Sequence, residues 1–160
     1  MVPRPLAGSV ALSISLACAG TAAGYALFFP TGVRWPAGAI VMHLQLGSTT
    51  PILTDGSADW GQAAEAALAL WNPHMASGQF QVVRRSSAPI GERNGVNNVF
   101  FDDAIYGDRF GANTLAVTIS YRSGSRIIES DVIFNTAKSF DSYRGALRRT
   151  IDFRRVAVHE

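Results

Sequence analysis

The sequence predicts an α/β domain (α+β in some classifications) in which helices pack on one face of a single β-sheet. A strand-like segment comes first, a helical segment follows it, and four further strand-like segments precede a last helix. The 160 residues, 48% of them hydrophobic, are enough for one domain with a substantial core and too few for two. The sequence contains no internal repeat and no low-complexity segment.

The first strand and the first helix are marked by periodicity and by a cap. Residues 39–47 alternate well enough between apolar and polar side chains for a strand. After the loop that follows, Asp59 stands where an N-cap is expected, and Gln62 completes a capping box. We expect the helix to end before Asn72 and Pro73. Its apolar residues recur at helical spacing: Trp60, Ala63, Ala64, Ala67, Leu68 and Trp71.

Four more strands and a second helix complete the predicted domain. The strands are expected at residues 79–85, 95–101, 114–122 and 126–135. The second helix is expected to begin near Thr150 or Asp152. It reaches Glu160 without a glycine C-cap or a proline, and so short a helix is marginal on its own. The sequence therefore predicts that the domain is cut inside this helix and that its C-terminal part is missing.

The N-terminus has the order of a secretory signal peptide. Arg4 supplies an early positive charge, an apolar stretch begins at Leu6, and small residues follow. A membrane-spanning helix would need about 20 apolar residues, and this stretch is too rich in Gly, Ser and Ala. We therefore expect a signal peptide at residues 1–23, a lead-in at 24–34 and an exported domain at 35–160.

The only cysteine, Cys18, lies inside the signal segment. The sequence around it loosely resembles the cleavage box of bacterial lipoproteins, so a lipid-anchored protein of the cell envelope is an alternative to a secreted, extracellular one. In either case the domain contains no cysteine pair to form a disulfide. We expect a monomer that touches a membrane only if it is anchored through Cys18.

The charge of the chain is mildly basic and does not indicate nucleic-acid binding. The formal net charge is +2 and the isoelectric point about 9.0, without a basic stripe interleaved with aromatic residues. One local run of arginines is best explained as a solvated helix face, with an anionic-ligand patch as the alternative. Its members are Arg144, Arg148, Arg149, Arg154 and Arg155.

The chain ends on a histidine followed by a glutamate, His159 and Glu160. On a helix this pair is the first half of the H-E-x-x-H motif, in which two histidines bind zinc and the glutamate acts as general base. Alone, such a pair is more often an ordinary structural or surface pair. Here, however, residues 32–160 resemble the matrixin branch of the metzincin zinc peptidases, in its secreted bacterial form. The segments that resemble it, in order, are "GVRWPAGAIVMHLQL", "AAEAALALWNP", "GVNNVFF", "YGDRFGANTLAVT", "IIESDVIFN" and "DFRRVAVHE".

This resemblance implies a zinc-dependent metalloendopeptidase built on a twisted five-stranded mixed sheet. The fourth strand would lie antiparallel at the edge of the sheet and pair with an extended peptide or protein substrate. The residues in the matching stretch are Thr114, Leu115, Ala116 and Val117. An ordinary amphipathic strand is the alternative for them. By the same match, His159 is the first zinc ligand and Glu160 the general base.

Several features depart from the pattern of the family. The motif is incomplete after Glu160, and a catalytic zinc needs three protein ligands. We therefore expect the 160-residue chain neither to hold catalytic zinc nor to cleave peptides. The histidines that bind a structural zinc in animal matrixins are replaced by Tyr106, Val117 and Ile133, which leaves only Asp108 and predicts no structural zinc.

Calcium and a second function are left open. Oxygen ligands for calcium are offered by Asp102, Asp103, Asp108, Asp131 and Asn135, although turn-forming and capping roles explain these residues better. His43 and His74 fit no site and are expected to be structural. The alternative function is a non-catalytic secreted domain that kept the sheet and its peptide-accepting edge.

Overall fold

The computed structural model describes residues 32–48 and 52–160 of the chain. The predicted signal peptide and most of the predicted lead-in therefore lie outside the described residues. No helix in the described part of the chain is long and apolar enough to cross a membrane.

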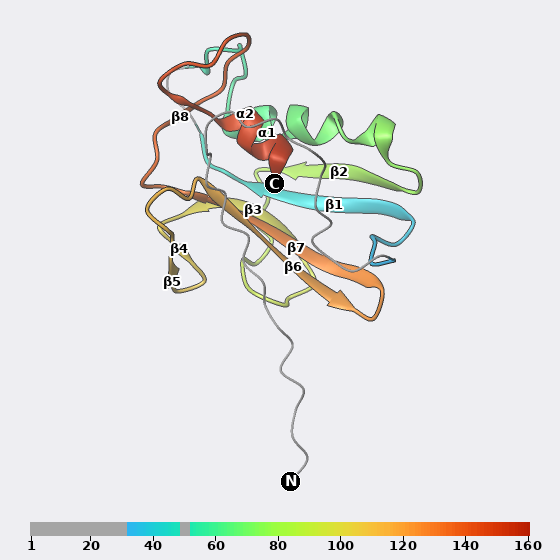
Figure 1. The fold of residues 1–160 in the computed structure, drawn as a ribbon. Helices are drawn as coiled ribbons and strands as arrows, with labels where there is room; N and C mark the ends of the chain where they lie inside the picture. Colours follow the sequence, from blue (N-terminus) through green and yellow to red (C-terminus); the bar gives the residue numbers. More distant parts are fainter. Residues whose placement is uncertain (1–31, 49–51) are drawn as a thin grey trace.

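A five-stranded mixed sheet forms the centre of the domain, in the order β2-β1-β3-β7-β6 (Figure 1). Its strands are β1 (Gly38–Gln45), β2 (Gly78–Arg84), β3 (Asn97–Asp102), β6 (Ala116–Ser123) and β7 (Arg126–Asn135). All neighbours in the sheet run parallel except β6, which is antiparallel to β7 and, among residues 32–48 and 52–160, has a neighbour on one side only. The predicted α/β class and five-stranded mixed sheet are confirmed.

Two helices lie on one face of this sheet (Figure 1). They are α1 (Trp60–Ala69) and α2 (Phe153–His159), and a short 3-10 helix, η1 (Asn72–His74), follows α1. The cap of α1 is as predicted, because the Asp59 carboxylate accepts a hydrogen bond of 2.8 Å from the Gln62 N–H. The Gln62 side chain, however, bonds to the N–H of Ala58 at 2.7 Å rather than to that of Asp59, so the capping box is shifted by one residue.

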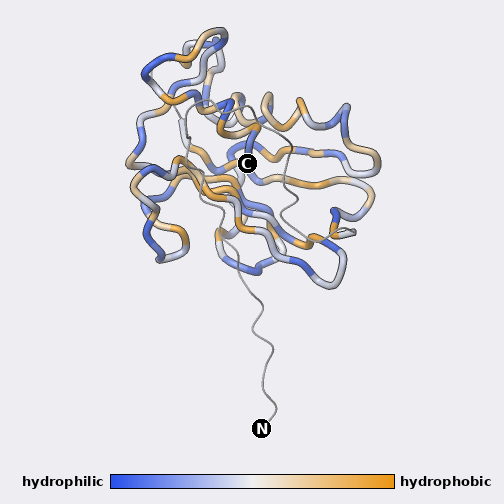
Figure 2. Tube along the Cα trace, in the orientation of Figure 1, coloured by the Kyte–Doolittle hydropathy of each residue, from blue (hydrophilic) through white to orange (hydrophobic). Residues whose placement is uncertain are grey.

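The main core fills the space between these helices and the sheet. Ile40, Met42 and Leu44 alternate along β1 and are almost fully buried, together with Ala63 and Ala64 of α1. Figure 2 shows the alternation along the central strands, where hydrophobic and hydrophilic segments succeed one another. The small side chains of α1 let the helix approach the sheet closely.

An aromatic cluster closes this core where α2 begins. Phe134 of β7 and Phe153 of α2 are both 0% exposed, and their ring centroids lie 4.5 Å apart. Three more aromatic rings contact Phe153 at centroid distances of 5.0 to 6.1 Å: Trp60, Phe101 and Phe140. The start of α2 is thereby fixed on the sheet.

The opposite face of the sheet carries a second, smaller core. Its fully or nearly buried members are Phe100, Val117, Ile119, Tyr121 and Ile133. A hairpin of β4 (Ala104–Ile105) and β5 (Asp108–Arg109) covers this cluster. The sequence predicts only a loop here, but Tyr106 and Gly107 both have positive φ, as a two-residue hairpin turn requires.

The remaining differences from the prediction concern element ends. β3 begins at Asn97 and not at residue 95, because Gly95 has φ 76 and belongs to the preceding turn. β6 begins at Ala116, so Thr114 and Leu115 precede the strand.

A short parallel pair of strands, β8 (Phe140–Asp141) and β9 (Ile151–Asp152), connects the two ends of the loop that precedes α2.

The charge of Asp59 is expected to contribute to stability beyond its role as a cap. Its carboxylate contacts the Arg84 and Arg85 guanidinium groups at 2.9 and 3.2 Å. Burial disfavours its ionised form, but hydrogen bonds from the Gln62 N–H and from these arginines outweigh burial and lower the pKa of Asp59. This contribution is therefore present at neutral pH and lost in acid, as the pH falls through the folded-state pKa.

Two substitutions at Asp59 separate the cap from the charge. Asp59→Ala removes both and is expected to lower the free energy of unfolding by about 1–2 kcal/mol. Asp59→Asn keeps a good N-cap and should lower it by less, because both arginines can regain water. Urea unfolding at neutral pH measures the free energy of unfolding of both variants and so shows which of them loses more. Equal losses for the two variants would show that the cap contributes nothing.

Candidate active site

The position of α2 is fixed at its first turn. The Asp152 carboxylate caps the helix by accepting a hydrogen bond of 3.1 Å from the Arg154 N–H, and it contacts the Arg155 side chain at 3.3 Å. Phe153, the next residue, is buried in the aromatic cluster, and Val156 is buried one turn later. These contacts determine where the end of the helix, with His159 and Glu160, meets the sheet.

The last turn of α2 bonds to α1 and to the edge strand. The Trp71 indole N–H, beyond the end of α1, donates to the Val158 carbonyl at 3.0 Å. The Thr118 hydroxyl on β6 donates to Oε2 of Glu160 at 2.7 Å and to its main-chain oxygen at 3.2 Å. The helix end thus lies between α1 and the antiparallel edge strand.

His159 and Glu160 lie in different environments. The His159 side chain is exposed, whereas the Glu160 carboxylate is directed inward. Its Oε1 is buried and has no hydrogen-bond partner among the described residues. Burial raises the pKa of Glu160 to about 7, although the hydrogen bonds from Thr118 oppose the rise. A carboxylate with a pKa near neutrality can both accept and return a proton at neutral pH.

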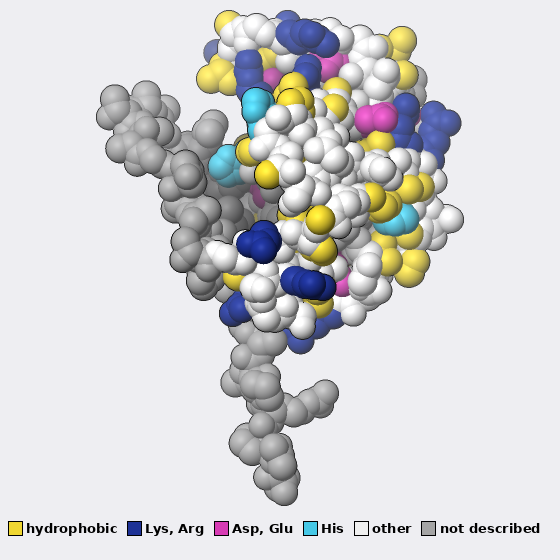
Figure 3. All heavy atoms as spheres, turned by 90° about the vertical axis from the view of Figure 1, so that its right-hand side faces the viewer, with side chains coloured by type: hydrophobic (Ala, Val, Ile, Leu, Met, Phe, Trp, Pro, Cys, Tyr) yellow, Lys and Arg dark blue, Asp and Glu magenta, His cyan; other side chains and the backbone are white. Residues whose placement is uncertain are grey.

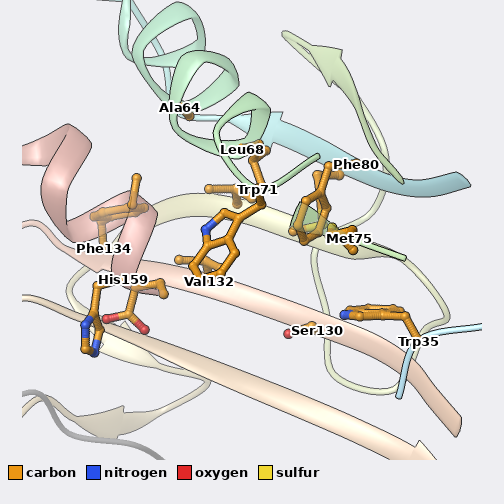
Figure 4. Close-up of a pocket in the computed structure, with 14 residues that line it drawn as sticks. Trp35, Ala64, Leu68, Trp71, Met75, Phe80, Ser130, Val132, Phe134 and His159 are labelled. Atoms are coloured by element: carbon orange, nitrogen blue, oxygen red, sulfur yellow. The ribbon is translucent and has the colours of Figure 1, made fainter. Parts of the chain in front are cut away.

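An apolar hollow of about 250 Å³ opens beside the end of α2. It lies between α1, the end of α2 and the sheet, and its walls include Leu68, Trp71, Phe80 and Val132. Figure 4 shows the Trp71 indole over its middle, Trp35 at one end and His159 at the other. Trp71 is 44% exposed, which is unusual for a large apolar side chain. The sequence places Trp71 on the apolar stripe of the helix, but the helix ends at Ala69 and the Trp71 side chain is exposed.

The predicted substrate-binding stretch lies at the rim of the sheet, but most of its side chains are buried. Thr114, Ala116 and Val117 are at most 4% exposed, and Leu115 is half-buried. The Leu115 carbonyl accepts the Asn135 N–H at 2.9 Å, which directs the main chain of Leu115 toward β7. Because alternate residues of a strand direct their main-chain groups to opposite sides, Ala116 and Thr118 direct theirs away from β7, where the Thr118 N–H is hydrogen-bonded to the Glu160 carboxylate.

The residues at the structural-zinc positions of animal matrixins lie near one another on the face of the sheet opposite the helices. Val117 and Ile133 are 0% exposed and belong to the second core, and Tyr106 packs against it. Asp108 is exposed on β5. Within residues 32–48 and 52–160, no three His, Cys, Asp or Glu side chains are grouped closely enough to hold a metal ion.

The oxygen atoms considered for calcium include several that bond within the protein. Both carboxylate oxygens of Asp131 accept hydrogen bonds, from the Asn98 N–H and the Tyr106 phenol, each at 2.8 Å. Asn135 donates to the Thr114 carbonyl and accepts from the Ala137 N–H, both at 2.9 Å.

Of the two histidines assigned no site, His43 makes a hydrogen bond of 2.8 Å with the Ser86 hydroxyl.

Positive side chains are spread over the visible face of the domain in several small groups (Figure 3). Two members of the basic run, Arg148 and Arg155, lie over the ring of Tyr143 at 4.7 and 5.5 Å. Their cations therefore help to order the loop before α2.

Three residues of this region, Thr118, Trp71 and Trp35, have contacts that the sequence alone does not reveal. Thr118 follows the predicted rim stretch directly. Its place in the predicted strand is the one feature of the sequence that could have indicated that it belongs to the site. Its contact with Glu160 depends on the register between β6 and β7 and on the placement of α2.

Comparison with protein-family models gives no match to this chain, and comparison with curated proteins gives none either. The likeness to matrixins therefore remains a resemblance, and the function is inferred from the residues and from their geometry.

Proposed function

We propose that the chain is the N-terminal part of a secreted, matrixin-like zinc metalloendopeptidase, in which His159 is the first zinc ligand and Glu160 the general base. One observation carries the proposal. A histidine–glutamate pair ends a helix beside a free antiparallel edge strand, and the glutamate carboxylate is buried against Thr118 of that strand. The pair and the strand are where a base and an extended peptide would have to meet.

The residues present fit part of a catalytic zinc site. The exposed imidazole of His159 can supply one ligand, and Oε1 of Glu160, which has no partner in the part of the chain that the structure describes, can bond to water. Catalytic zinc takes three protein ligands, so the other two would belong to polypeptide beyond Glu160. The apolar hollow beside the helix end is a suitable place for such a segment, because its walls include aromatic side chains that are partly or largely exposed, such as those of Trp35, Trp71 and Phe80.

The proposed reaction is hydrolysis of a peptide bond. When bound, zinc activates water and polarises the scissile carbonyl. Glu160 would accept a proton from the water and pass it to the leaving amine. The edge of β6 would bind the substrate in an extended conformation through the main-chain groups of Ala116.

A non-catalytic secreted peptide-binding domain is the second candidate. It is favoured by the edge of β6, which alone would suffice to bind a peptide. It requires neither zinc nor a base at Glu160.

Zinc content separates the two candidates. The complete product of the gene is expected to contain about one zinc per chain, measured by elemental analysis after dialysis, and to lose peptide-cleaving activity when the metal is chelated. His159→Ala should lower the zinc content, while His74→Ala, at an exposed histidine after α1, should not. A complete product without zinc would support the binding domain instead.

A further inference from the structure

The loop between β8 and β9, residues 144–150, carries the most exposed large apolar side chain of the described residues. Every residue of the loop is exposed, and at its middle Leu147 is 76% exposed. The loop stands beyond α1 and α2 at the upper left of Figure 1. Single exposed leucines are common on protein surfaces, so the surroundings of Leu147 decide whether it has a role.

The loop is held in one conformation by Tyr143, which is only 2% exposed. The Tyr143 phenol donates to the Thr150 carbonyl at 2.9 Å and accepts the Arg148 N–H at 3.1 Å. The Arg155 side chain of α2 donates to the Gly145 carbonyl. The loop therefore presents Leu147 in a fixed arrangement, so that binding a partner there costs little conformational entropy.

Positive charge is concentrated around this leucine. Residues 141–155 contain five arginines and two aspartates, a net charge of +3, whereas the whole chain has +2. The sequence favours a solvated helix face for these arginines, but α2 begins at Phe153, so three of the five lie on the loop. They are Arg144, Arg148 and Arg149.

Two of the loop arginines are not neutralised within the described part of the domain. Arg148 lies over the Tyr143 ring, as Arg155 does. Arg144 and Arg149 are exposed, and neither forms an ion pair with an acidic side chain among residues 32–48 and 52–160. Their charge is therefore available to an anionic partner.

A second exposed apolar side chain lies on a segment that is bonded to this region. The Asp55 N–H donates to the Ser142 carbonyl at 2.7 Å, and the Thr54 N–H donates to the Asp141 carboxylate at 3.0 Å. Ile52, two residues before Thr54, is 67% exposed. The two most exposed large apolar side chains of the described residues thus belong to segments that lie side by side.

We propose that the 144–150 loop docks the protein on the surface of a membrane that contains anionic phospholipids. Leu147 would enter the boundary between headgroups and acyl chains, and the arginines would bind lipid phosphates, which their N–H donors suit. Long arginine stems let the charged groups stay at phosphate level while the leucine lies deeper. Nucleic acid is a poorer match, because the loop has no aromatic side chain on which bases could stack. The contact needs no lipid at Cys18 and does not depend on the proposed function.

Vesicle binding tests the role of the arginines. The complete gene product is used in its exported form, with Cys18→Ser in every sample so that no lipid anchor can form. It is expected to sediment with phosphatidylcholine vesicles only when they also contain phosphatidylglycerol. Arg144→Gln together with Arg149→Gln should weaken this binding about tenfold or more, since each arginine near an anionic surface contributes about fivefold.

The matched control removes two positive charges from the opposite side of the domain. Arg109→Gln together with Arg126→Gln, at exposed arginines of β5 and β7, should change the affinity by less than about twofold, because charges far from the surface are screened. Equal losses in the two double variants would overturn the proposed docking surface, as would equal binding to vesicles without phosphatidylglycerol.

A fluorescent label tests the insertion of Leu147. An environment-sensitive dye on Leu147→Cys is expected to emit at shorter wavelength when anionic vesicles are added, because it leaves water. The same dye on Ile128→Cys, at a 53% exposed residue of β7, should not respond, and protein without an added cysteine gives the blank. Arginine-dependent binding without a shift at residue 147 would overturn membrane docking and assign the arginines to a soluble polyanion, such as an acidic protein.

Discussion

Replacing Glu160 by glutamine in the complete gene product is expected to lower kcat for peptide cleavage by about 10²- to 10⁴-fold. Glutamine has nearly the same shape and can still accept the hydrogen bond from Thr118, but it cannot take a proton from water. The zinc content should stay at about one per chain, because Glu160 is proposed as a base and not as a ligand.

The control for this variant is Glu65→Gln on α1. Glu65 is half-buried and makes a long contact of 3.8 Å with Arg84, so its replacement should leave kcat unchanged. A fully active Glu160→Gln protein would rule out Glu160 as the base. A loss of zinc together with activity would make Glu160 part of the metal site instead.

Phe153→Ala is expected to lower the free energy of unfolding by about 3–5 kcal/mol. Phe153 is 0% exposed, contacts four aromatic side chains and is the first residue of α2. Alanine would leave a cavity at the point where α2 is fixed on the sheet. Urea unfolding measures the loss, and the same cavity should loosen the helix that positions His159 and Glu160.

Leu147→Ala serves as the matched control for Phe153. Leu147 is 76% exposed, so losing its side chain should change the free energy of unfolding by no more than about 0.5 kcal/mol. If Phe153→Ala proved as mild, the aromatic cluster would not be the element that holds α2.

Much of the fold follows from local patterns in the sequence. The bounds of β7 are as predicted, because its apolar run ends in a polar Asn–Thr pair. The cap of α1 at Asp59 follows from the chemistry of its side chain. The β4–β5 hairpin does not, because its turn begins with Tyr106, a residue that rarely adopts positive φ.

Buried acids are the least predictable feature. In the segment around Glu129 and Asp131, two carboxylates two residues apart resemble the solvated side of a strand. They are buried because the 91–95 loop and the hairpin, both distant in sequence, cover them and donate hydrogen bonds. Nothing local to β7 contains that information.

The candidate site likewise has a part that the local sequence predicts and a part that only tertiary packing determines. His159 and Glu160 follow from a two-residue motif and its helical context. The burial of the Glu160 carboxylate, its bond to Thr118 and the bond from Trp71 to the helix end depend on tertiary packing. The side chains of Thr114 and Val117 are buried, so any peptide binding by this stretch would use the main chain at the free edge.

Sequencing the gene beyond the codon for Glu160 decides whether the histidine–glutamate pair begins a zinc site. The expected reading frame continues with two residues, His, two residues, Gly, two residues and His, which completes the metzincin motif. A stop codon directly after Glu160, or a continuation without those histidines, would contradict the peptidase and leave a peptide-binding scaffold.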